Sequence, residues 1–334
     1  MSMYRIFFAL AILFSSALSA KVRILTFHYN QADFIELQYK TFSKFLKEDF
    51  ELIVFNDAAT TYNKEQIEKV CKQYGITCIR FEPEWHLTDP INTYIHMRMQ
   101  DPSVSGYWNW SASTTIEEIS QHPSVRHSHV IHFALENYGY DHDDIIVLMD
   151  GDNFLVKPLS LTALLKHTDI VAFSRWGVDP YGNYRKQFMA ELPKDLPHYP
   201  WVVFVAFDPR KIPSPRELQF GPEVVNSHPA FNENSIGDTG SACFKYLKKY
   251  PQVKLREFIW LYGCTLLDQC TPAEVSMMGI SPHLMQLNRD VRPHTVQLFL
   301  YEHFIHIGRG SFEPEGHHKV VHHFHKFVDK ILAE

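Results

Sequence analysis

Two aspartates separated by one glycine follow the most apolar stretch of the sequence. Residues 145–149 read Ile-Ile-Val-Leu-Met, and Asp150, Gly151 and Asp152 come directly after them. A strand that is apolar throughout is typical of a parallel sheet covered on both faces, and ligands bind at the carboxyl ends of such strands. Two neighbouring carboxylates repel each other unless a cation relieves the repulsion. The pattern therefore predicts that Asp150 and Asp152 hold a hard divalent ion, Mn²⁺ or Mg²⁺, opposite a leaving diphosphate.

Two other interpretations of this segment were weighed. Aspartate, glycine and asparagine are ordinary turn residues, so a solvated turn is the simplest alternative. An EF-hand calcium loop is excluded, because the sequence has no twelve-residue loop with a closing glutamate and flanking helices at this place. The apolar run before the turn favours the metal site.

A second group of candidate ligands lies near the C-terminus, where residues 301–311 read YEHFIHIGRGS. His303 and His306 are three residues apart, so on a strand only one of them would face the metal. Of the two, His306 is closer to Gly308, and imidazole is a suitable ligand for Mn²⁺.

The first half of the sequence alternates between strand and helix patterns. The predicted elements are strands at 22–27, 50–55 and 76–81, a helix around 34–46, and a helix at 63–74 that stops at Gly75. This order opens a parallel, doubly wound sheet. Residues 82–124 are expected to be irregular, and a helix capped by Ser124 is expected to run to about Tyr138.

The second half has weaker signals but no linker. Predicted elements there are helices at 161–166 and 239–250, strands at 170–173, 201–207 and 296–304, and an amphipathic helix in the His-rich tail. The chain is 45% hydrophobic, which is enough for a large core. We therefore expect one domain over 21–334.

The segment IIVLMDGDNFLVKPL, residues 145–159, resembles the Asp-x-Asp region of GT-A-fold glycosyltransferases. The order of elements before it is similar as well, and the resemblance covers residues 22–175 well and the remainder loosely. It implies a Rossmann-like α/β fold with a mostly parallel central sheet flanked by helices. It also implies transfer of a sugar from a nucleotide diphosphate sugar, a UDP-sugar by general resemblance, to a hydroxyl of a glycan, lipid or protein. Asp150 would contact ribose or metal, Asp152 would bind metal and diphosphate, and His306 would be the third ligand. The backbone near Gly308 and the side chain of Arg309 would then approach phosphate oxygens. Residues 21–160 would be the nucleotide-sugar half, and 161–334 the acceptor half with the C-terminal metal and diphosphate loop.

The same resemblance points to further residues of a donor site. In that fold the ends of the first two strands hold the base and ribose, which suggests Thr26, His28 and Asp57. Arg126 lies in the first turn of the helix before the Asp-x-Asp strand, where it would hold a phosphate or the sugar. The alternatives are a turn role for Asp57 and an exposed surface position for Arg126.

Asp238 is the candidate on the acceptor side. Residues 237–240 read Gly-Asp-Thr-Gly and precede a predicted helix. In an inverting enzyme Asp238 would be the general base for the acceptor hydroxyl, and in a retaining enzyme it would orient the sugar. A helix N-cap is the alternative. Trp201 would stack on a sugar ring, although core packing is the default for a tryptophan.

Composition and missing motifs narrow the function classes. The formal net charge is −6, and clustered Lys and Arg are missing, so a nucleic-acid partner is not expected. Two alternatives to a glycosyltransferase were kept. One is a non-catalytic carbohydrate-binding surface protein. The other is a different metal-dependent nucleotide enzyme, a nucleotidyltransferase or phosphohydrolase, although the sequence has neither a Gly-rich basic phosphate loop nor a DxDxT motif.

The first twenty residues have the layout of a secretory signal. Arg5 precedes an apolar run at 6–14, and small residues fill 15–20. We expect a signal peptide or a short uncleaved anchor, and export to the ER/Golgi lumen, the periplasm or the exterior. This segment would be the chain's membrane contact. Among five cysteines, Cys71 with Cys78 and Cys264 with Cys270 are candidate pairs, and the odd count leaves at least one thiol free.

Overall fold

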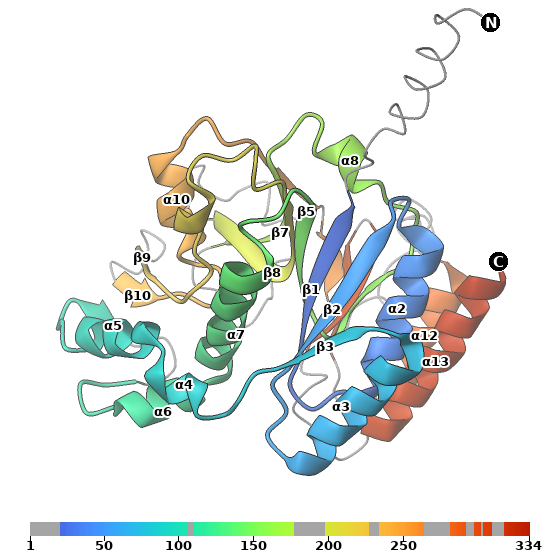
Figure 1. Ribbon diagram of the computed structural model, residues 1–334, viewed down its shortest axis with the longest axis horizontal. Coiled ribbons are helices and arrows are strands. Elements are labelled where there is room, and N and C mark those ends of the chain that lie inside the picture. Colours follow the sequence, from blue (N-terminus) through green and yellow to red (C-terminus); the bar gives the residue numbers. More distant parts are fainter. Residues whose placement is uncertain are drawn as a thin grey trace, which may run out of the picture.

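A seven-stranded sheet lies at the centre of the computed structural model (Figure 1), which describes residues 21–105, 110–176, 198–226, 234–258, 260–263, 281–291, 297–301, 303–308 and 317–334. The strand order is β11-β7-β8-β5-β1-β2-β3. The strands are β1 (Val22–His28), β2 (Phe50–Asn56), β3 (Thr77–Arg80), β5 (Ile145–Asp150), β7 (Ile170–Trp176), β8 (His198–Phe207) and β11 (Leu255–Glu257). β8 runs antiparallel to both its neighbours, and the other pairs are parallel. The predicted α/β fold with a mostly parallel central sheet is confirmed.

Helices cover both faces of this sheet. They are α2 (Asp33–Phe45) and α3 (Thr61–Tyr74) on one face, and α7 (Pro123–Tyr138) on the other. Strand β5 is buried between them, because Val147 and Met149 pack with α2 and α3 while Ile146 and Leu148 pack with α7. Burial of each such side chain contributes about 1.5–3 kcal/mol. This explains why the central strand of the sequence is apolar at every position.

Local signals set the ends of α3. The Thr60 hydroxyl accepts the backbone N–H of Asn63, so the helix begins at Thr61, two residues before the predicted start. Gly75 ends the helix with φ of 66°, in the left-handed region that favours glycine, as predicted.

The expectation that residues 82–124 are irregular is wrong. This segment contains α4 (Trp85–Thr88), α5 (Pro90–Met99), β4 (Val104–Ser105) and α6 (Ile116–Gln121). Asp89 caps α5, Thr115 and Glu118 form a capping box on α6, and α7 begins at Pro123 with His122 rather than Ser124 as its cap. These helices are too short for a clear periodic pattern, and a small core shared with Ile236 stabilises them.

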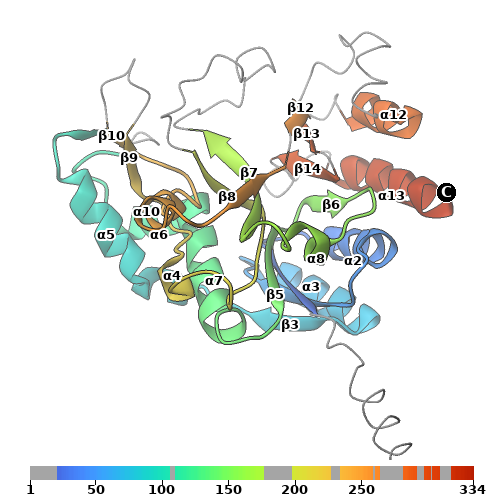
Figure 2. The ribbon, with the colours of Figure 1, turned by 90° about the horizontal axis from the view of Figure 1, so that it is seen from above.

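A second sheet joins the C-terminal part of the chain to the Asp-x-Asp region. Its order is β12-β13-β14-β6, with β6 (Asn153–Leu155), β12 (Trp260–Gly263), β13 (Gln297–Tyr301) and β14 (Phe304–Gly308). The single strand predicted at 296–304 is thus the beginning of an antiparallel hairpin. Figure 2 shows these strands beside α12 (Pro282–Val291) and α13 (His317–Ala333). α13 is the predicted amphipathic tail helix, and its Phe324 ring lies 5.5 Å from that of Phe154.

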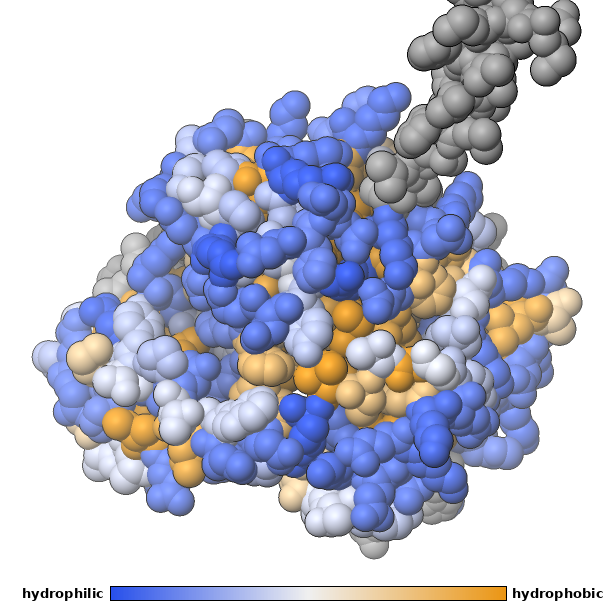
Figure 3. Space-filling model, in the orientation of Figure 1, coloured by the Kyte–Doolittle hydropathy of each residue, from blue (hydrophilic) through white to orange (hydrophobic). Residues whose placement is uncertain are grey.

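The helix α8 (Leu161–Leu164) packs against the core on the α2 and α3 side of the sheet. The remaining described elements lie on the side of the molecule around α7. They are α10 (Cys243–Lys249), the turn of 3-10 helix at Pro215–Glu217, and β9 (Val224–Asn226) and β10 (Asn234–Ile236), which form a three-stranded sheet with β4. On the face seen in Figure 3, apolar residues gather near the middle, in the area of β1 to β3, and hydrophilic residues surround them. The division into two functional halves stays a prediction.

Three expectations concern the termini and cysteines. Residues 1–20, which carry the predicted signal, and Cys264 and Cys270 lie outside the described residues. Among the described helices, none has the length and apolar character needed to cross a bilayer. Cys71 and Cys78 are free thiols, and they lie close enough for a hydrogen bond. The predicted pair is therefore adjacent but not linked.

Candidate metal centre

Two carboxylates and one imidazole converge at the carboxyl end of β5. The ligand atoms of Asp150, Asp152 and His306 all lie within 4.8 Å of one another. His306 Nε2 is 3.2 Å from Asp152 Oδ1, which is close to the spacing of about 3 Å between adjacent ligands of an octahedral ion with 2.0–2.2 Å bonds. The structure thus brings together the three predicted metal ligands.

The C-terminal hairpin places His306 at this point. β14 pairs antiparallel with β6, and His306 lies directly opposite Asn153, the residue after Asp152. The backbone N–H of Ile307 also donates to the Asp152 carbonyl oxygen at 2.9 Å. His303 lies outside this strand, against the ring of Phe258. The choice of His306 over His303 therefore agrees with the geometry.

His127, which the sequence pattern did not single out, faces the carboxylate of Asp150. Its Nε2 lies 3.1 Å from Asp150 Oδ1, and its ring packs edge-on against Phe27. Consecutive residues of a helix point about 100° apart, so Arg126 and His127 of α7 face the ends of different strands. This rotation is the signal by which the sequence could have revealed His127, since His127 directly follows the candidate residue Arg126. Each aspartate consequently has an imidazole beside it.

The electrostatics of the site favour a cation. Burial raises the pKa of Asp150, and the nearby Asp152 raises it further, whereas His127 and His306 act in the opposite direction. A bound Mn²⁺ or Mg²⁺ would replace this unfavourable burial of negative charge by direct ligation. Three protein ligands leave about three octahedral positions for water or phosphate oxygens. The donor set is therefore suited to Mn²⁺ or Mg²⁺ with a diphosphate.

The turn between the aspartates is held by close packing and by one glutamine. A Cβ on Gly151 would lie 2.6 Å from the Phe27 carbonyl oxygen, so a side chain does not fit there. Gln38 Nε2 donates to the carbonyl oxygens of Asp150 and Asn153 at 2.8 and 3.0 Å. Gln38 is a polar residue on the buried face of α2, which is the signal by which the sequence could have revealed it.

Thr26 and His28 lie on the α2 side of β1, behind this turn. The Thr26 hydroxyl donates to Gln38 Oε1 at 3.0 Å, and His28 Nε2 lies 3.1 Å from the same oxygen. Both side chains are buried, and burial lowers the pKa of His28 to about 4. Their geometry makes them supports of the metal turn, and the proposed contact with the nucleotide stays a prediction.

Asp57 and Arg126, the other two predicted donor-site residues on described elements, are in contact. Arg126 Nη2 donates to Asp57 Oδ1 at 2.9 Å, and the guanidinium lies 5.3 Å from the centre of the Tyr29 ring. The same oxygen accepts a hydrogen bond from His86 Nε2 at 2.7 Å, and His86 Nδ1 lies 3.1 Å from His129 Nδ1. Asp57 is thus an ordered, mostly buried acceptor at the end of β2. Nucleotide binding by the pair stays a prediction.

Replacing Arg126 by glutamine should lower the free energy of unfolding by about 1–3 kcal/mol, because Asp57 would lose a charged hydrogen-bond partner in a largely buried place. The matched control is Arg98→Gln, since Arg98 pairs with Asp101 at 3.9 Å at a half-buried position that is more open to solvent than that of the Arg126–Asp57 pair. The control should change the free energy of unfolding by less than about 0.5 kcal/mol. Urea unfolding measures both values, and equal losses in the two variants would contradict the role given to the Asp57 pair.

Buried His129 should make the protein sensitive to mild acid. Burial, and then the nearby His86, His132 and Arg126, lower the pKa of His129 to about 2. The unfolded chain, with a pKa near 6.5, binds the proton more readily, so stability present above pH 6.5 is lost as the pH falls. Protonation of this one group should lower the free energy of unfolding by about 1.4 kcal/mol per pH unit below pH 6.5. The free energy of unfolding, measured with urea at pH 6.5, 6.0 and 5.5, should fall less steeply with decreasing pH in His129→Gln than in the exposed control His322→Gln.

Asp238 and the C-terminal glycine loop complete the predicted site. Asp238 is half-buried, its Oδ1 accepts the N–H of Thr239 at 2.7 Å, and α10 begins only at Cys243, so Asp238 is not its N-cap. The Thr239 hydroxyl donates to the Ser124 carbonyl oxygen and so fixes this loop to the first turn of α7. Gly308 ends β14, and Arg309 lies outside the described residues. The roles of all three stay predictions.

Trp201 packs as the default expectation for a tryptophan predicts, and stacking on a sugar ring stays a prediction. Its ring packs edge-on against His306, with ring centres 5.4 Å apart. It also packs against the main core cluster. The default expectation of core packing therefore applies, and Trp201 limits the movement of the His306 imidazole.

Comparisons with known proteins were made at three levels. No family model matches the chain, and no curated protein matches it significantly. Solved structures that it resembles include a mannosyltransferase from Pyrobaculum calidifontis in complex with GDP-Man and Mn²⁺, at 12% identity and a TM-score of 0.32, over 83% of this chain and 63% of that chain. Core-mannan synthase A from Aspergillus fumigatus in its Mn/GDP form has 10% identity and a TM-score of 0.33, over 59% and 61%. The mannosyltransferase Ktr4p from S. cerevisiae in complex with GDP has 13% identity and a TM-score of 0.32, over 58% of this chain and 58% of that chain.

These similarities have a limited weight. The matched part spans less than two thirds of each of those chains, and TM-scores of 0.32 and 0.33 carry no argument about function. The enzymes are glycosyltransferases, which is the class that the Asp-x-Asp segment resembles. The metal centre of this chain groups two aspartates and a histidine at the carboxyl end of a central strand.

Proposed function

We propose that this chain is a metal-dependent glycosyltransferase that moves a sugar from a nucleotide diphosphate sugar to a hydroxyl acceptor. The observation that carries the proposal is the convergence of Asp150, Asp152 and His306 at the carboxyl end of β5. Sheet ends of this kind are where α/β proteins bind ligands, and the three donors are suited to an ion that also binds phosphate. The ion would offset the negative charge that develops on the leaving diphosphate.

The chain's own residues would divide the remaining tasks. Asp150, Asp152 and His306 would hold the ion, while His127 would orient the Asp150 carboxylate from the other side. Gln38 keeps the turn in place, so the ligands are positioned before substrate arrives. Asp238 would take the proton from the acceptor hydroxyl if the reaction inverts the anomeric centre.

The proposal predicts that nucleotide binding requires the metal. UDP, GDP and their sugar conjugates are tested by thermal shift with Mn²⁺ and with a chelator. At a concentration of 100 times Kd, a bound nucleotide stabilises the folded chain by about 2.7 kcal/mol. We propose a UDP-sugar as donor, and the two nucleotide series decide between UDP and GDP. A shift that is the same in the chelator, or no shift with any nucleotide, would contradict the proposal.

Product analysis separates the other two functions. A glycosyltransferase releases the nucleoside diphosphate and links the sugar to a hydroxyl. Release of a nucleoside monophosphate with a sugar phosphate would indicate a phosphohydrolase. Glycan binding that needs neither metal nor nucleotide would indicate a carbohydrate-binding protein.

We also propose export by residues 1–20, on the basis of their apolar and small-residue pattern. Fractionation of cells that express the full chain tests this, and a product that stays with the cytosol contradicts it.

A further inference from the structure

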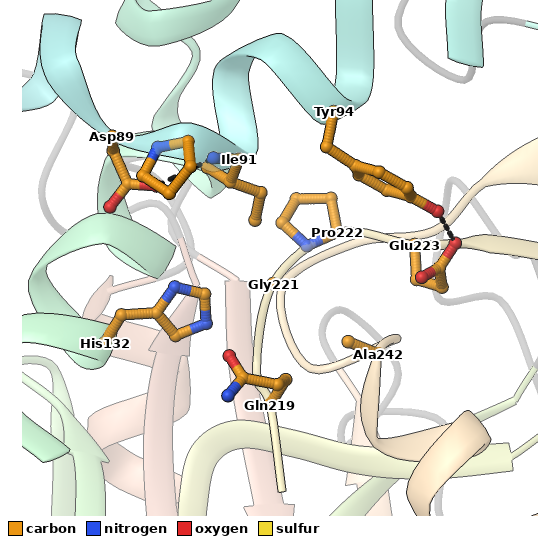
Figure 4. Close-up of a pocket in the computed structure, with 10 residues that line it drawn as sticks. Asp89, Ile91, Tyr94, His132, Gln219, Gly221, Pro222, Glu223 and Ala242 are labelled. Carbon is orange, nitrogen blue, oxygen red and sulfur yellow. Dashed lines mark hydrogen bonds between the residues drawn. The ribbon is translucent and has the colours of Figure 1, made fainter. Parts of the chain in front are cut away.

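A pocket of about 300 Å³ lies beside α7, between residues of α5 and residues 219–223 (Figure 4). Its polar lining residues are Asp89, Tyr94, His132, Gln219 and Glu223. The volume is at the lower end of the range for small-molecule sites, so it suits a single ring. None of the residues that carry the metal centre contributes to its wall.

The pocket shares two structural elements with the candidate reaction site. His132 of the pocket and His127 of the metal centre are both on α7, about 7.5 Å apart along the helix axis. The loop that carries Asp238 packs directly on the pocket wall, because Gly237 N–H donates to the Glu223 carbonyl oxygen and the Ser241 hydroxyl accepts the Glu223 N–H. The pocket therefore lies on the same side of the fold as Asp238.

The charges of the wall exclude an anionic ligand and do not call for a cationic one. Among the described residues that line the pocket, none is Lys or Arg, and two are acids. Both acids already have partners: Glu223 pairs with Lys245 at 2.5 Å and accepts the Tyr94 hydroxyl, and Asp89 accepts the N–H of Ile91 at 2.9 Å as the cap of α5. A phosphate would be repelled, whereas the remaining lone pairs suit hydroxyl donors.

The other lining groups suit a neutral, hydroxyl-rich ring. The Gln219 amide supplies a donor and an acceptor, and its side chain is exposed. Burial lowers the pKa of His132, so its ring is neutral and can donate from one nitrogen and accept at the other. Ile91 and two prolines add apolar surface of the kind that packs on the C–H face of a sugar. Small apolar faces combined with a few fixed polar groups are typical of ligand sites.

Gly221 keeps the pocket open. A Cβ at this position would lie 2.2 Å from Ile91 Cδ1 and 3.5 Å from His132 Cε1, so any side chain would occupy the space between α5 and α7. Ala242, at the start of α10, is the other small residue of the wall, and its side chain is half-buried. Both positions are small where a larger residue would close the site.

We propose that this pocket binds a neutral sugar ring of the acceptor, as a subsite on the Asp238 side of the metal centre. This inference rests on the proposed glycosyltransferase function. It names the acceptor class as a glycan, and it places recognition of that glycan on α5, α7 and residues 219–223.

The test is direct binding of methyl glycosides of glucose, galactose and mannose, measured by saturation-transfer NMR on the full chain with Mn²⁺ present. At least one glycoside should bind, and Ala242→Phe should weaken it at least tenfold by filling the pocket. Ala163→Phe is the matched control, because Ala163 is an exposed alanine of α8. Gln219→Ala should weaken binding about threefold, and it cannot block the pocket or disturb a buried core because Gln219 is exposed.

The outcomes separate the two proposals. If Mn²⁺-dependent nucleotide binding is found but no glycoside binds, or if Ala242→Phe and Ala163→Phe bind glycosides equally well, the pocket proposal is overturned and the glycosyltransferase proposal stands. If glycosides bind in the pocket but no nucleotide binds with Mn²⁺, the glycosyltransferase proposal is overturned, sugar binding by the pocket stands, and the chain is a carbohydrate-binding protein. Loss of binding in both Ala242→Phe and Gln219→Ala, with retention in Ala163→Phe, supports the pocket.

Discussion

Asp152→Asn should remove tight Mn²⁺ binding and lower sugar transfer by roughly 10²–10³-fold. The substitution keeps the shape of the side chain and its contact with His306, but it removes one of the two negative charges that hold the ion. Isothermal titration with Mn²⁺ and the rate of nucleoside diphosphate release measure the two effects. Both should fall together, because the same carboxylate that holds the ion positions it against the leaving diphosphate.

The metal-free form of this variant should be as stable as the metal-free wild type, within about 1 kcal/mol. Asp152 raises the pKa of Asp150, so loss of its charge relieves a repulsion and offsets the weaker contact with His306. Asp329→Asn is the matched control, since Asp329 is an exposed acid of α13. Wild-type Mn²⁺ affinity in Asp152→Asn, or an equal loss of activity in Asp329→Asn, would refute the metal assignment.

Gly151→Ala is the second substitution with a large expected effect. The added Cβ would lie 2.6 Å from the Phe27 carbonyl oxygen and 2.9 Å from His28 Nδ1. The Phe27 carbonyl belongs to the backbone at the end of β1, a central strand, so it moves less easily than a side chain and the turn must shift. Overpacking of this kind costs about 1–3 kcal/mol of folding free energy. A displacement of about 1 Å at a reacting centre costs about 10²-fold in rate, so transfer should fall by that amount.

Urea unfolding and Mn²⁺ titration together test this prediction. Gly221→Ala provides the comparison, because its new Cβ would meet Cδ1 of Ile91, the flexible end of a side chain. Gly221→Ala should therefore keep the Mn²⁺ affinity of the wild type. The proposed role of Gly151 is wrong if Gly151→Ala keeps full stability and normal Mn²⁺ affinity.

Several parts of this protein follow from local sequence. The apolar run at 145–149 predicts a strand covered on both faces, because only a strand without polar residues can be buried on both sides of a sheet. Asp150 and Asp152 follow it at the ligand-binding edge, and Gly75 ends α3 through its left-handed backbone. The amphipathic apolar pattern of the tail predicts α13. In each case the signal is contained within about twenty neighbouring residues.

Other parts depended on contacts between distant segments. His306 reaches Asp152 because β14 pairs with β6 across about 150 residues, and nothing in either segment alone specifies that partner. Asp57 gains His86 from α4, a helix too short to show a periodic pattern, and Asp150 gains His127 from the rotation of α7 over the sheet. Local sequence determines which residues form a strand or a turn, because backbone preference and apolar period act over short distances. Tertiary packing alone decided which polar side chains meet at the strand ends, since many pairings bury similar apolar area and only the folded core selects among them.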